Sequence, residues 1–314
     1  MKVHEAVRST GQDASRNLAW ALVLLFTVFG LAPVFLSARQ VVDQTGRRVN
    51  IPDRPARLVS LAPSITETLF ALGLGNQLVG DTDYCDFPPA ARQKAHVGSI
   101  LNPNLERIVA LKPDLVLGSP GANRRETADQ LERLGVPVYG VKAESVEETL
   151  RSIEDLGHVL GRESEAQGLV ASLRRRIAAV EHRAAARRNP KVLFVVWYRP
   201  LTTAGPHTFI DDVIRRAGGV PINDGLNGEW PHLSLEEALH RDPDVILFPS
   251  SEAFSPSLDE LARLPGCKDL RAVKMHQLYF IPETIIRPSP RLIDALEGVA
   301  RIFDAFEKGK EVGR

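Results

Sequence analysis

Residues 105–117 read LERIVALKPDLVL, and residues 235–247 read LEEALHRDPDVIL. The two stretches align without a gap, share five identical residues, and keep apolar residues where a helix and a strand would flank a Pro-Asp turn. A helix followed by a turn and a strand is common in α/β proteins, so one copy alone would be weak evidence for a fold. However, each copy lies in a run of alternating strands and helices. The repeat therefore predicts two similar α/β lobes.

The segment before the first copy has the pattern of a strand, a tight loop and a helix. Leu58–Leu61 is a short apolar strand, and the spacing of Ser64 and Glu67 predicts a capping box that starts the following helix. Gly73 and Gly75 come after this helix rather than between a strand and a helix, so they do not form a dinucleotide-binding loop. The second lobe opens in a comparable way, with a strand from Val192 to Trp197.

The stretch between the two lobes predicts long helices. A capping box at Ser145 starts one helix that ends near Gly161, and another at Ser164 starts a helix that has no Gly or Pro from Leu169 to Arg188. At 1.5 Å per residue the second helix would be about 30 Å long, which suits a stiff connection between lobes. Its arginines are interspersed with other residues, as on a solvated helix face. We expect four parts: a signal peptide or membrane anchor at 1–38, an N-terminal α/β lobe at 57–160, a linking helix at 162–189 and a C-terminal α/β lobe at 190–310.

The N-terminus indicates export. Residues 17–38 contain no charged side chain, and Arg8 and Arg16 precede them, which is typical of a membrane-targeting segment. Leu36 is a poor match to the small residue of a signal-peptide cleavage site, so both a cleaved signal and an uncleaved anchor remain open. In either case we expect the remainder to be periplasmic or extracytoplasmic, either free or anchored by residues 18–38.

Composition and motifs narrow the function. Lys plus Arg and Asp plus Glu both number 39 in the 314 residues, and this zero net charge argues against a nucleic-acid partner. The sequence has no G-x-S-x-G elbow, no phosphate-binding P-loop and no H-E-x-x-H pair, and its eight histidines are scattered. We therefore expect no enzymatic activity, no bound metal and no cofactor. An exported α/β enzyme remains the alternative.

Aromatic residues are concentrated after the predicted strands. Tyr84 and Phe87 lie in the first lobe, and Trp197, Tyr198 and Trp230 lie in the second. Such rings can hold a large flat ligand by stacking, although rings at sheet ends can also belong to the core.

A loop near the C-terminus provides a polar group for the same site. Glu283 to Arg291 follows a strand at Leu278–Ile281, and it places Arg287 beside prolines. Arg287 can donate hydrogen bonds to carboxylate, phosphate or amide oxygens of a ligand, or it can be an ordinary surface arginine. The two cysteines, Cys85 and Cys267, can form at most one disulfide or remain two thiols.

Taken together, several segments resemble the periplasmic binding proteins of ABC importers for cobalamin and ferric siderophores, with the strongest likeness to the cobalamin-binding members. The resemblance covers nearly all of the chain after the N-terminal segment, and it implies two Rossmann-like lobes joined by a single long helix, a class III periplasmic binding protein. The segments that carry it are RLVSLAPSITETLFALG at 57–73, YCDFPP at 84–89, NLERIVALKPDLV at 104–116 and RPSPR at 287–291.

The resemblance also assigns roles to individual residues. Tyr84, Trp230 and Arg287 match positions that face the ligand in the family. Glu106 and Glu236 match the two acidic residues, one in each lobe, that bind arginines of the permease dimer. Because the internal repeat places these two glutamates at equivalent positions, they suit a pseudo-symmetric receptor that docks on a two-fold permease. A glutamate in the first turn of a helix is also favoured by the helix dipole alone.

Other positions depart from the family pattern and leave the ligand open. Ile100 stands where the family has a tryptophan that flanks cobalamin, and Glu283 stands where it has an aspartate that contacts cobalamin. A residue near Thr202 replaces an aromatic residue of the second lobe. The resemblance implies cobalamin as the transported ligand, with a ferric siderophore or haem as the alternative. It implies an ABC permease dimer as the protein partner, with membrane contact only through the N-terminal segment or the permease.

Overall fold

The computed structural model describes residues 38–250 and 267–312. The contacts divide the chain into two units, Met1–Ala38 and Arg39–Arg314. The predicted signal peptide or anchor therefore lies outside the described residues, apart from Ala38. None of the helices in the described part of the chain is both long enough and apolar enough to cross a membrane.

The first large sheet consists of five parallel strands in the order β5-β4-β3-β6-β7. Its strands are β3 (Leu58–Ser60), β4 (Leu78–Asp81), β5 (Ala95–His96), β6 (Leu115–Gly118) and β7 (Val138–Gly140). The helices between them are α2 (Pro63–Ala71), the short η1 (Ala91–Gln93), α3 (Leu105–Ala110) and α4 (Arg125–Arg133). A separate two-stranded sheet, β1 (Ala38–Val42) with β2 (Arg48–Pro52), precedes them.

The second large sheet has the order β10-β8-β11-β12, with β9 antiparallel to β8 and the other pairs parallel. Its strands are β8 (Lys191–Tyr198), β9 (Leu201–Thr203), β10 (Val220–Pro221), β11 (Val245–Ser250) and β12 (Leu278–Pro282). Its helices are α7 (Phe209–Arg216), α8 (Leu235–Arg241), η2 (Cys267–Asp269), α10 (Arg271–Lys274) and η3 (Glu283–Ile286).

The internal repeat is present in the structure. The order β4-β3-β6-β7 in the first sheet corresponds to β10-β8-β11-β12 in the second, and α3 and α8 occupy the same place before the third of these strands. Lys112 and Asp242, which are aligned in the repeat, both have a φ angle of 47°. The aspartate of each Pro-Asp turn accepts a backbone hydrogen bond at the start of the neighbouring strand, Asp114 from the Arg57 nitrogen and Asp244 from the Lys191 nitrogen, both at 2.9 Å.

Alternation along the strands explains how both sheets share one core. In β8, Val192 and Phe194 point into the largest cluster of buried residues, whereas Leu193 points into a separate one. In β6, Leu115 joins the same large cluster and Val116 a third. Because side chains alternate across a strand, each sheet has one face on the shared core and one face covered by its own helices.

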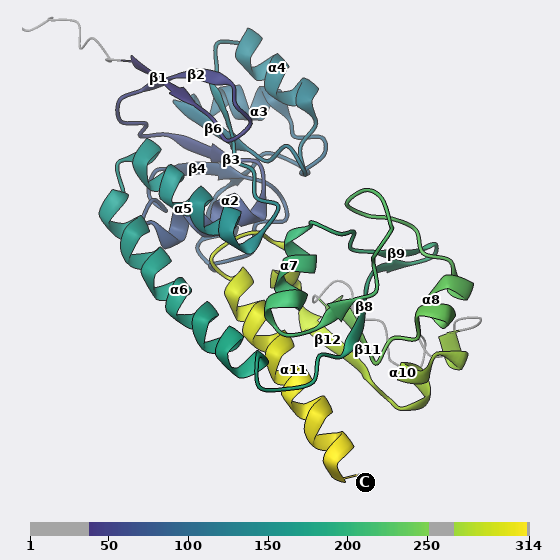
Figure 1. Ribbon diagram of the computed structural model, residues 1–314. Helices are drawn as coiled ribbons and strands as arrows, with labels where there is room; N and C mark the ends of the chain where they lie inside the picture. Colours follow the sequence, from purple (N-terminus) through teal and green to yellow (C-terminus); the bar gives the residue numbers. More distant parts are fainter. Residues whose placement is uncertain (1–37, 251–266, 313–314) are drawn as a thin grey trace, which may run out of the picture. The chain divides into compact units, whose positions relative to one another are not determined.

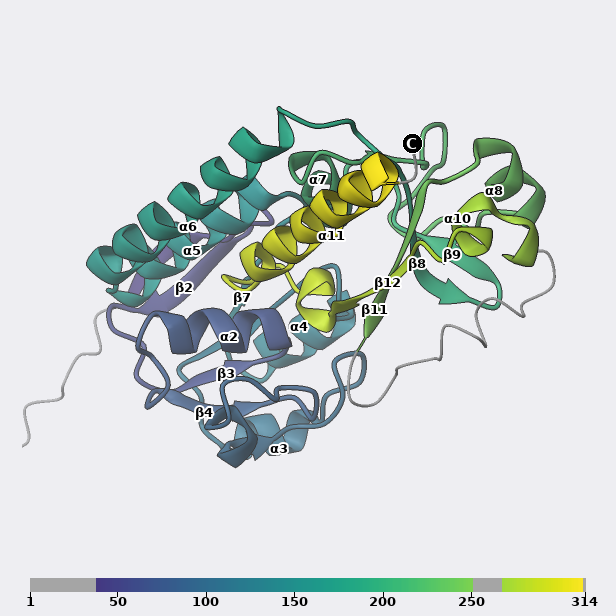
Figure 2. The ribbon, with the colours of Figure 1, turned by 90° about the horizontal axis from the view of Figure 1, so that it is seen from below.

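Three long helices complete the unit: α5 (Val146–Leu160), α6 (Glu163–Ala184) and α11 (Leu292–Val312). Figures 1 and 2 show α6 alongside α5 and α11, in agreement with the contacts between these helices. The 22 residues of α6 span about 33 Å.

The two capping boxes that the sequence predicts for α5 and α6 have different outcomes. Ser145 caps α5 by accepting from the Glu148 nitrogen, and Gly161 ends it at a φ angle of 67°, as predicted. The capping box at Ser164 is wrong, because α6 starts at Glu163 with Arg162 in the cap position and no side-chain cap.

Candidate ligand-binding site and docking residues

The predicted ligand-binding residues follow the carboxyl ends of parallel strands, which is where α/β proteins bind ligands. Tyr84 and Phe87 lie in the loop after β4, and their side chains are 56% and 41% exposed. The backbone of this loop is tied down, because the Asp83 nitrogen donates to the Gly98 oxygen and the Cys85 nitrogen to the Thr82 oxygen, both at 3.0 Å. The loop therefore presents two aromatic rings to solvent from a fixed backbone.

The second sheet presents its aromatic residues from β8 and from the loop before α8. Trp197 and Tyr198 end β8 with ring centroids 5.6 Å apart and an interplanar angle of 25°. Trp230 is held through its neighbours, because the Glu229 oxygen accepts from the Gly205 nitrogen at 2.8 Å. Trp197 is 48% exposed and Trp230 41%, so neither ring is a core residue at the end of a sheet.

Arg287 is buried among three carboxylates. Its Nη1 donates to Glu67 Oε1 at 3.0 Å and to Asp86 Oδ1 at 2.7 Å. Its Nη2 donates to Glu283 Oε1 at 3.1 Å. Glu67 and Asp86 belong to the part of the chain around the first sheet, whereas Glu283 and Arg287 follow β12 of the second. The structure thus brings Arg287 together with Glu283 and with the Tyr84–Phe87 loop, and it gives Arg287 protein partners that the sequence did not reveal.

Arg291 strengthens the same junction. Its guanidinium lies 3.7 Å from the centroid of the Phe87 ring, a cation–π contact, and its Nη1 is 3.3 Å from Glu67 Oε1. Ser289 donates from Oγ to Glu67 Oε2 at 2.6 Å. The loop that carries Arg287 is therefore anchored at three residues on one buried glutamate.

Glu67 is the residue of this cluster whose place the sequence analysis predicted wrongly. The predicted capping box is wrong: α2 starts at Pro63 with Ala62 as its cap residue and no side-chain cap, so both Ser64 and Glu67 lie inside the helix. The Glu67 side chain is only 2% exposed. The available signal was its position two residues before Leu69 in a short helix whose apolar residues pack into the core, because a carboxylate on a buried helix needs a buried partner.

The two cysteines are thiols in the structure. Cys85 is buried and Cys267 is partly buried. Thr66 donates from its hydroxyl to the Cys85 sulfur at 3.2 Å, and Thr82 lies 3.3 Å from the same sulfur. Burial raises the pKa of the Cys85 thiol above its usual value, although these two hydrogen bonds act in the opposite direction. Cys85 is therefore a packed and protonated part of the loop that carries Tyr84.

The two predicted docking residues have matching environments. Glu106 and Glu236 are both exposed and lie in the first turns of α3 and α8. The cap residue of each helix accepts a backbone hydrogen bond in the same way, Asn104 from the Arg107 nitrogen at 2.9 Å and Ser234 from the Glu237 nitrogen at 3.1 Å. Each carboxylate is thus presented to solvent by an equivalent, capped helix.

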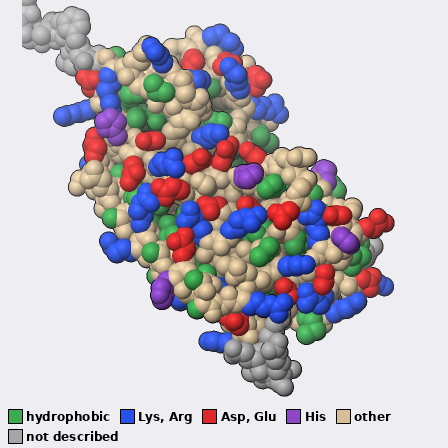
Figure 3. Space-filling view, in the orientation of Figure 1, with side chains coloured by type: hydrophobic (Ala, Val, Ile, Leu, Met, Phe, Trp, Pro, Cys, Tyr) green, Lys and Arg blue, Asp and Glu red, His purple; other side chains and the backbone are tan. Residues whose placement is uncertain are grey.

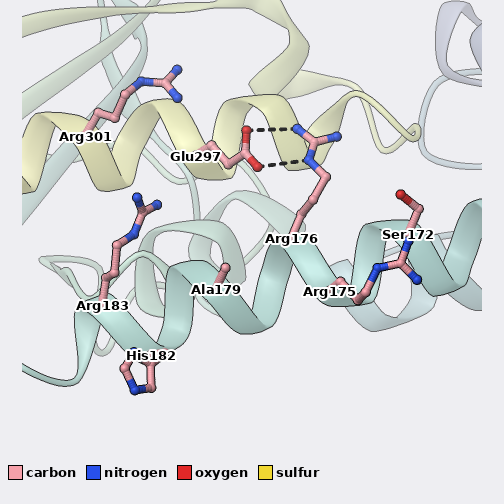
Figure 4. Close-up of a pocket in the computed structure, with 8 residues that line it drawn as sticks. All are labelled: Ser172, Arg175, Arg176, Ala179, His182, Arg183, Glu297 and Arg301. Atoms are coloured by element: carbon pink, nitrogen blue, oxygen red, sulfur yellow. Dashed lines mark hydrogen bonds and ion pairs between the residues drawn. The ribbon is translucent and has the colours of Figure 1, made fainter.

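A hollow of about 720 Å³ lies between α6 and α11, apart from all the predicted site residues. Figure 4 shows the arginines of α6 and α11 around it, with Arg176 bound to Glu297 by two hydrogen bonds, Nε to Oε1 and Nη2 to Oε2, both at 2.9 Å. The hydrogen bond from Arg176, together with the charges of Arg301 and Arg183, lowers the pKa of Glu297. These two hydrogen bonds join α6, the linking helix, to α11, the C-terminal helix.

Charge elsewhere is mixed. Figure 3 shows Lys and Arg intermingled with Asp and Glu over the face in view. In the described ranges 38–250 and 267–312, no group of three or more His, Cys, Asp or Glu side chains is placed to hold a metal ion.

Comparison with known proteins identifies the family. A family model described as periplasmic binding protein matches residues 58–285. The chain belongs to this family. The vitamin B12-binding protein of Yersinia pestis is 33% identical over 198 residues, which cover 63% of this chain and 70% of that protein. The family resemblance inferred from the sequence is therefore confirmed.

Solved structures confirm the fold class as well. The periplasmic vitamin B12 binding protein BtuF of Vibrio cholerae matches with a TM-score of 0.73 and 28% identity, over 82% of this chain and 100% of that one. The periplasmic haem-binding protein RhuT from Roseiflexus sp. RS-1, in its apo form, matches with a TM-score of 0.72 and 28% identity, over 80% and 98% of the two chains. The chain is a periplasmic binding protein of the BtuF type, and these relatives are binding proteins rather than enzymes.

Proposed function

We propose that this protein is an extracytoplasmic solute-binding protein that captures a corrinoid, cobalamin, and delivers it to an ABC permease. The observation that carries the proposal is the set of large aromatic side chains left exposed in the loop after β4, at the end of β8 and in the loop before α8. Exposed Trp and Tyr rings on fixed backbones are suited to a large, flat ligand, because they contribute apolar contact area at little conformational cost. The set is Tyr84, Phe87, Trp197 and Trp230.

The charges around Arg287 favour a ligand that donates hydrogen bonds. Three carboxylates, Glu67, Asp86 and Glu283, surround Arg287, while the positive charges of Arg291 and Arg92 act on Glu67 and Asp86. A corrinoid carries neutral amide groups on its rim; an amide oxygen can accept from Arg287 in the place of Asp86, and an amide N–H can donate to Glu283. The propionates of haem are anionic, and the same carboxylates would repel them.

A second candidate is the same role with haem or a ferric siderophore. The likeness to RhuT supports it, and so does Tyr84, because an exposed phenol oxygen is a known type of ligand for ferric iron. This candidate keeps the fold, the compartment and the permease, and it changes only the cargo.

Delivery to a permease is supported by Glu106 and Glu236. Two exposed carboxylates, presented by equivalent helices of a repeated architecture, match a partner that carries a basic group on each of two symmetric subunits. Capture and release need no covalent step, so we propose no enzymatic activity.

The test is a calorimetric titration of the purified full-length protein with cyanocobalamin, with haemin and a ferric hydroxamate siderophore as parallel titrants. We expect cyanocobalamin to bind one to one. Binding of haemin or the siderophore alone would transfer the role to the second candidate, and no binding of all three would refute the proposal.

Variants connect the binding to the site. Trp230→Ala and Tyr84→Ala are each expected to weaken binding about tenfold or more, because a stacked aromatic ring at the centre of an interface contributes about 2 kcal/mol. Met275→Ala is the matched control, since Met275 is 62% exposed but precedes β12, at the opposite end of the strand from the site. Equal affinities for all four proteins would place the ligand elsewhere.

A further inference from the structure

We propose that Glu67 is a positioning residue for ligand capture and that Asp86 occupies the place of the ligand at Arg287 in the empty protein. This inference rests on the proposed function, in which Arg287 contacts the ligand. Its basis is a difference between the carboxylates around Arg287: one is sealed in the core, and two are open to solvent.

Glu67 has the geometry of a permanent partner. Its side chain is 2% exposed, and both of its oxygens are occupied. Oε1 accepts from Arg287 at 3.0 Å and from Arg291 at 3.3 Å, and Oε2 accepts from Ser289 at 2.6 Å. Because a buried carboxylate without partners is very unfavourable, these bonds persist whether or not a ligand is present.

The helix that carries Glu67 is held rigidly in the core. Glu67 lies inside α2, and its helix neighbours Ile65 and Leu69 are fully buried in the core that both sheets share. An arginine side chain has many rotamers, and a binding site gains affinity when the useful one is already fixed. Glu67 fixes the guanidinium of Arg287 from behind and the backbone of its loop through Ser289.

Asp86 has the geometry of an exchangeable partner. Its side chain is 48% exposed, it lies in the same loop as Tyr84, and it accepts from Nη1 of Arg287 at 2.7 Å. Glu283 is 33% exposed and accepts from Nη2 at 3.1 Å. A ligand oxygen can replace an exposed carboxylate at little cost in free energy, because water solvates the carboxylate once it has left the arginine.

Opposite effects on affinity follow for the two acids. If a ligand must displace Asp86, the empty protein spends part of its time in a state that cannot bind, and this raises the apparent dissociation constant. Removing the charge of Asp86 should therefore tighten binding by about two- to fivefold, the range set by a partly exposed ion pair. Removing the charge of Glu67 should weaken binding about tenfold or more, because Arg287 loses its fixed orientation.

The experiment is a calorimetric titration of cyanocobalamin, with haemin in parallel, into wild-type protein, Glu67→Gln, Asp86→Asn and the control Asp83→Asn. Asp83 is exposed on the same loop, and Arg287 makes no bond to it, so its variant changes the same charge without touching the cluster. We expect Asp86→Asn to bind more tightly than Asp83→Asn, Glu67→Gln to bind more weakly, and Glu67→Asp, which keeps the charge, to recover part of the loss.

The outcomes distinguish a failure of the proposed function from a failure of this inference. Wild-type protein that binds neither titrant refutes the proposed function and this inference with it. Wild-type protein that binds, with Asp86→Asn no tighter than Asp83→Asn, refutes only the exchange at Arg287. An unchanged dissociation constant for folded Glu67→Gln refutes the positioning role. If Glu67→Gln does not fold, Ser289→Ala, which removes one bond to Glu67 and leaves its charge, takes its place with an expected weakening of severalfold.

Discussion

Replacing Asp81 by Asn is expected to stabilise the protein at neutral pH and to have little effect near pH 4. Asp81 ends β4, directly before the loop of Tyr84, and its side chain is fully buried. Oδ1 lies 2.9 Å from His96 Nδ1, and Oδ2 is buried without a hydrogen-bond partner among the described residues. Burial raises the pKa of Asp81 from 3.8 to about 6, although the contact with His96 acts in the opposite direction.

The magnitude follows from linkage between proton binding and folding. The unfolded chain loses the Asp81 proton near pH 3.8 and the folded chain near pH 6, so the contribution of Asp81 is most favourable below pH 3.8. That contribution is lost as the pH rises through this window, because only the unfolded state is then ionised. A difference of about two pKa units corresponds to about 3 kcal/mol, which is an upper limit for the loss above pH 6.

Urea unfolding of wild-type protein and Asp81→Asn at pH 4, 6 and 8 measures the effect. Asn stays neutral, so we expect the variant to exceed the wild type in free energy of unfolding by up to about 3 kcal/mol at pH 8, with most of the difference gone at pH 4. Asp83→Asn, which removes a neighbouring negative charge that itself raises the pKa of Asp81, is expected to show a smaller gain of the same sign. An Asp81→Asn protein that is less stable than wild type at pH 8 would refute the reasoning, since it would show that the ionised carboxylate is stabilised by its surroundings.

Two further predictions test the docking residues and the support of the aromatic loop. Changing Glu106 and Glu236 together to Ala should leave ligand affinity unchanged and should abolish uptake by vesicles that contain the permease. Stability should fall by no more than about 1–2 kcal/mol, because each first-turn acid contributes about 0.3–1 kcal/mol through the helix dipole; a loss of ligand affinity would contradict the docking role. Gly205→Ala should lower the free energy of unfolding by about 1–3 kcal/mol and weaken ligand binding, because its Cβ would overlap the backbone oxygen of Gly228, next to the loop of Trp230. Gly168→Ala, with open space around the new Cβ, is its control in urea unfolding, and equal losses for both variants would show that the contact is unimportant.

The fold was predictable because its signals are local and repeated. The stretch 105–117 and its copy at 235–247 contain the helix, the turn and the strand within thirteen residues, and apolar side chains mark both elements. Residues at the same position of the two copies then correspond by symmetry, which is why Glu106 and Glu236 could be paired from the repeat. The cap of α5 was also predictable, because Ser145 accepts from the nitrogen of Glu148, only three residues later.

The candidate site was predictable only in its exposed members. Aromatic residues after strands can form a ligand surface or belong to the core, and the exposure of Trp197 and Trp230 agrees with the first interpretation. Of the three carboxylate partners of Arg287, only Glu283 is close to it in the sequence. Its partner Glu67 lies 220 residues away in the sequence, and spacing alone made Glu67 look like a helix cap.

The error at Glu67 shows what fixing the guanidinium of Arg287 requires from the rest of the fold. Prolines beside Arg287 can fix its backbone, but they leave the long side chain free to choose among rotamers. Fixing the guanidinium takes an anion placed behind it, and that anion must be buried, since an exposed one would exchange with solvent and with the ligand itself. A buried anion is stable only where the core is already closed around it. The residue that fixes the guanidinium of Arg287 is therefore expected on a core helix such as α2, far from Arg287 in the sequence, whereas the exposed Asp86 is suited to give way to a ligand at the proposed site.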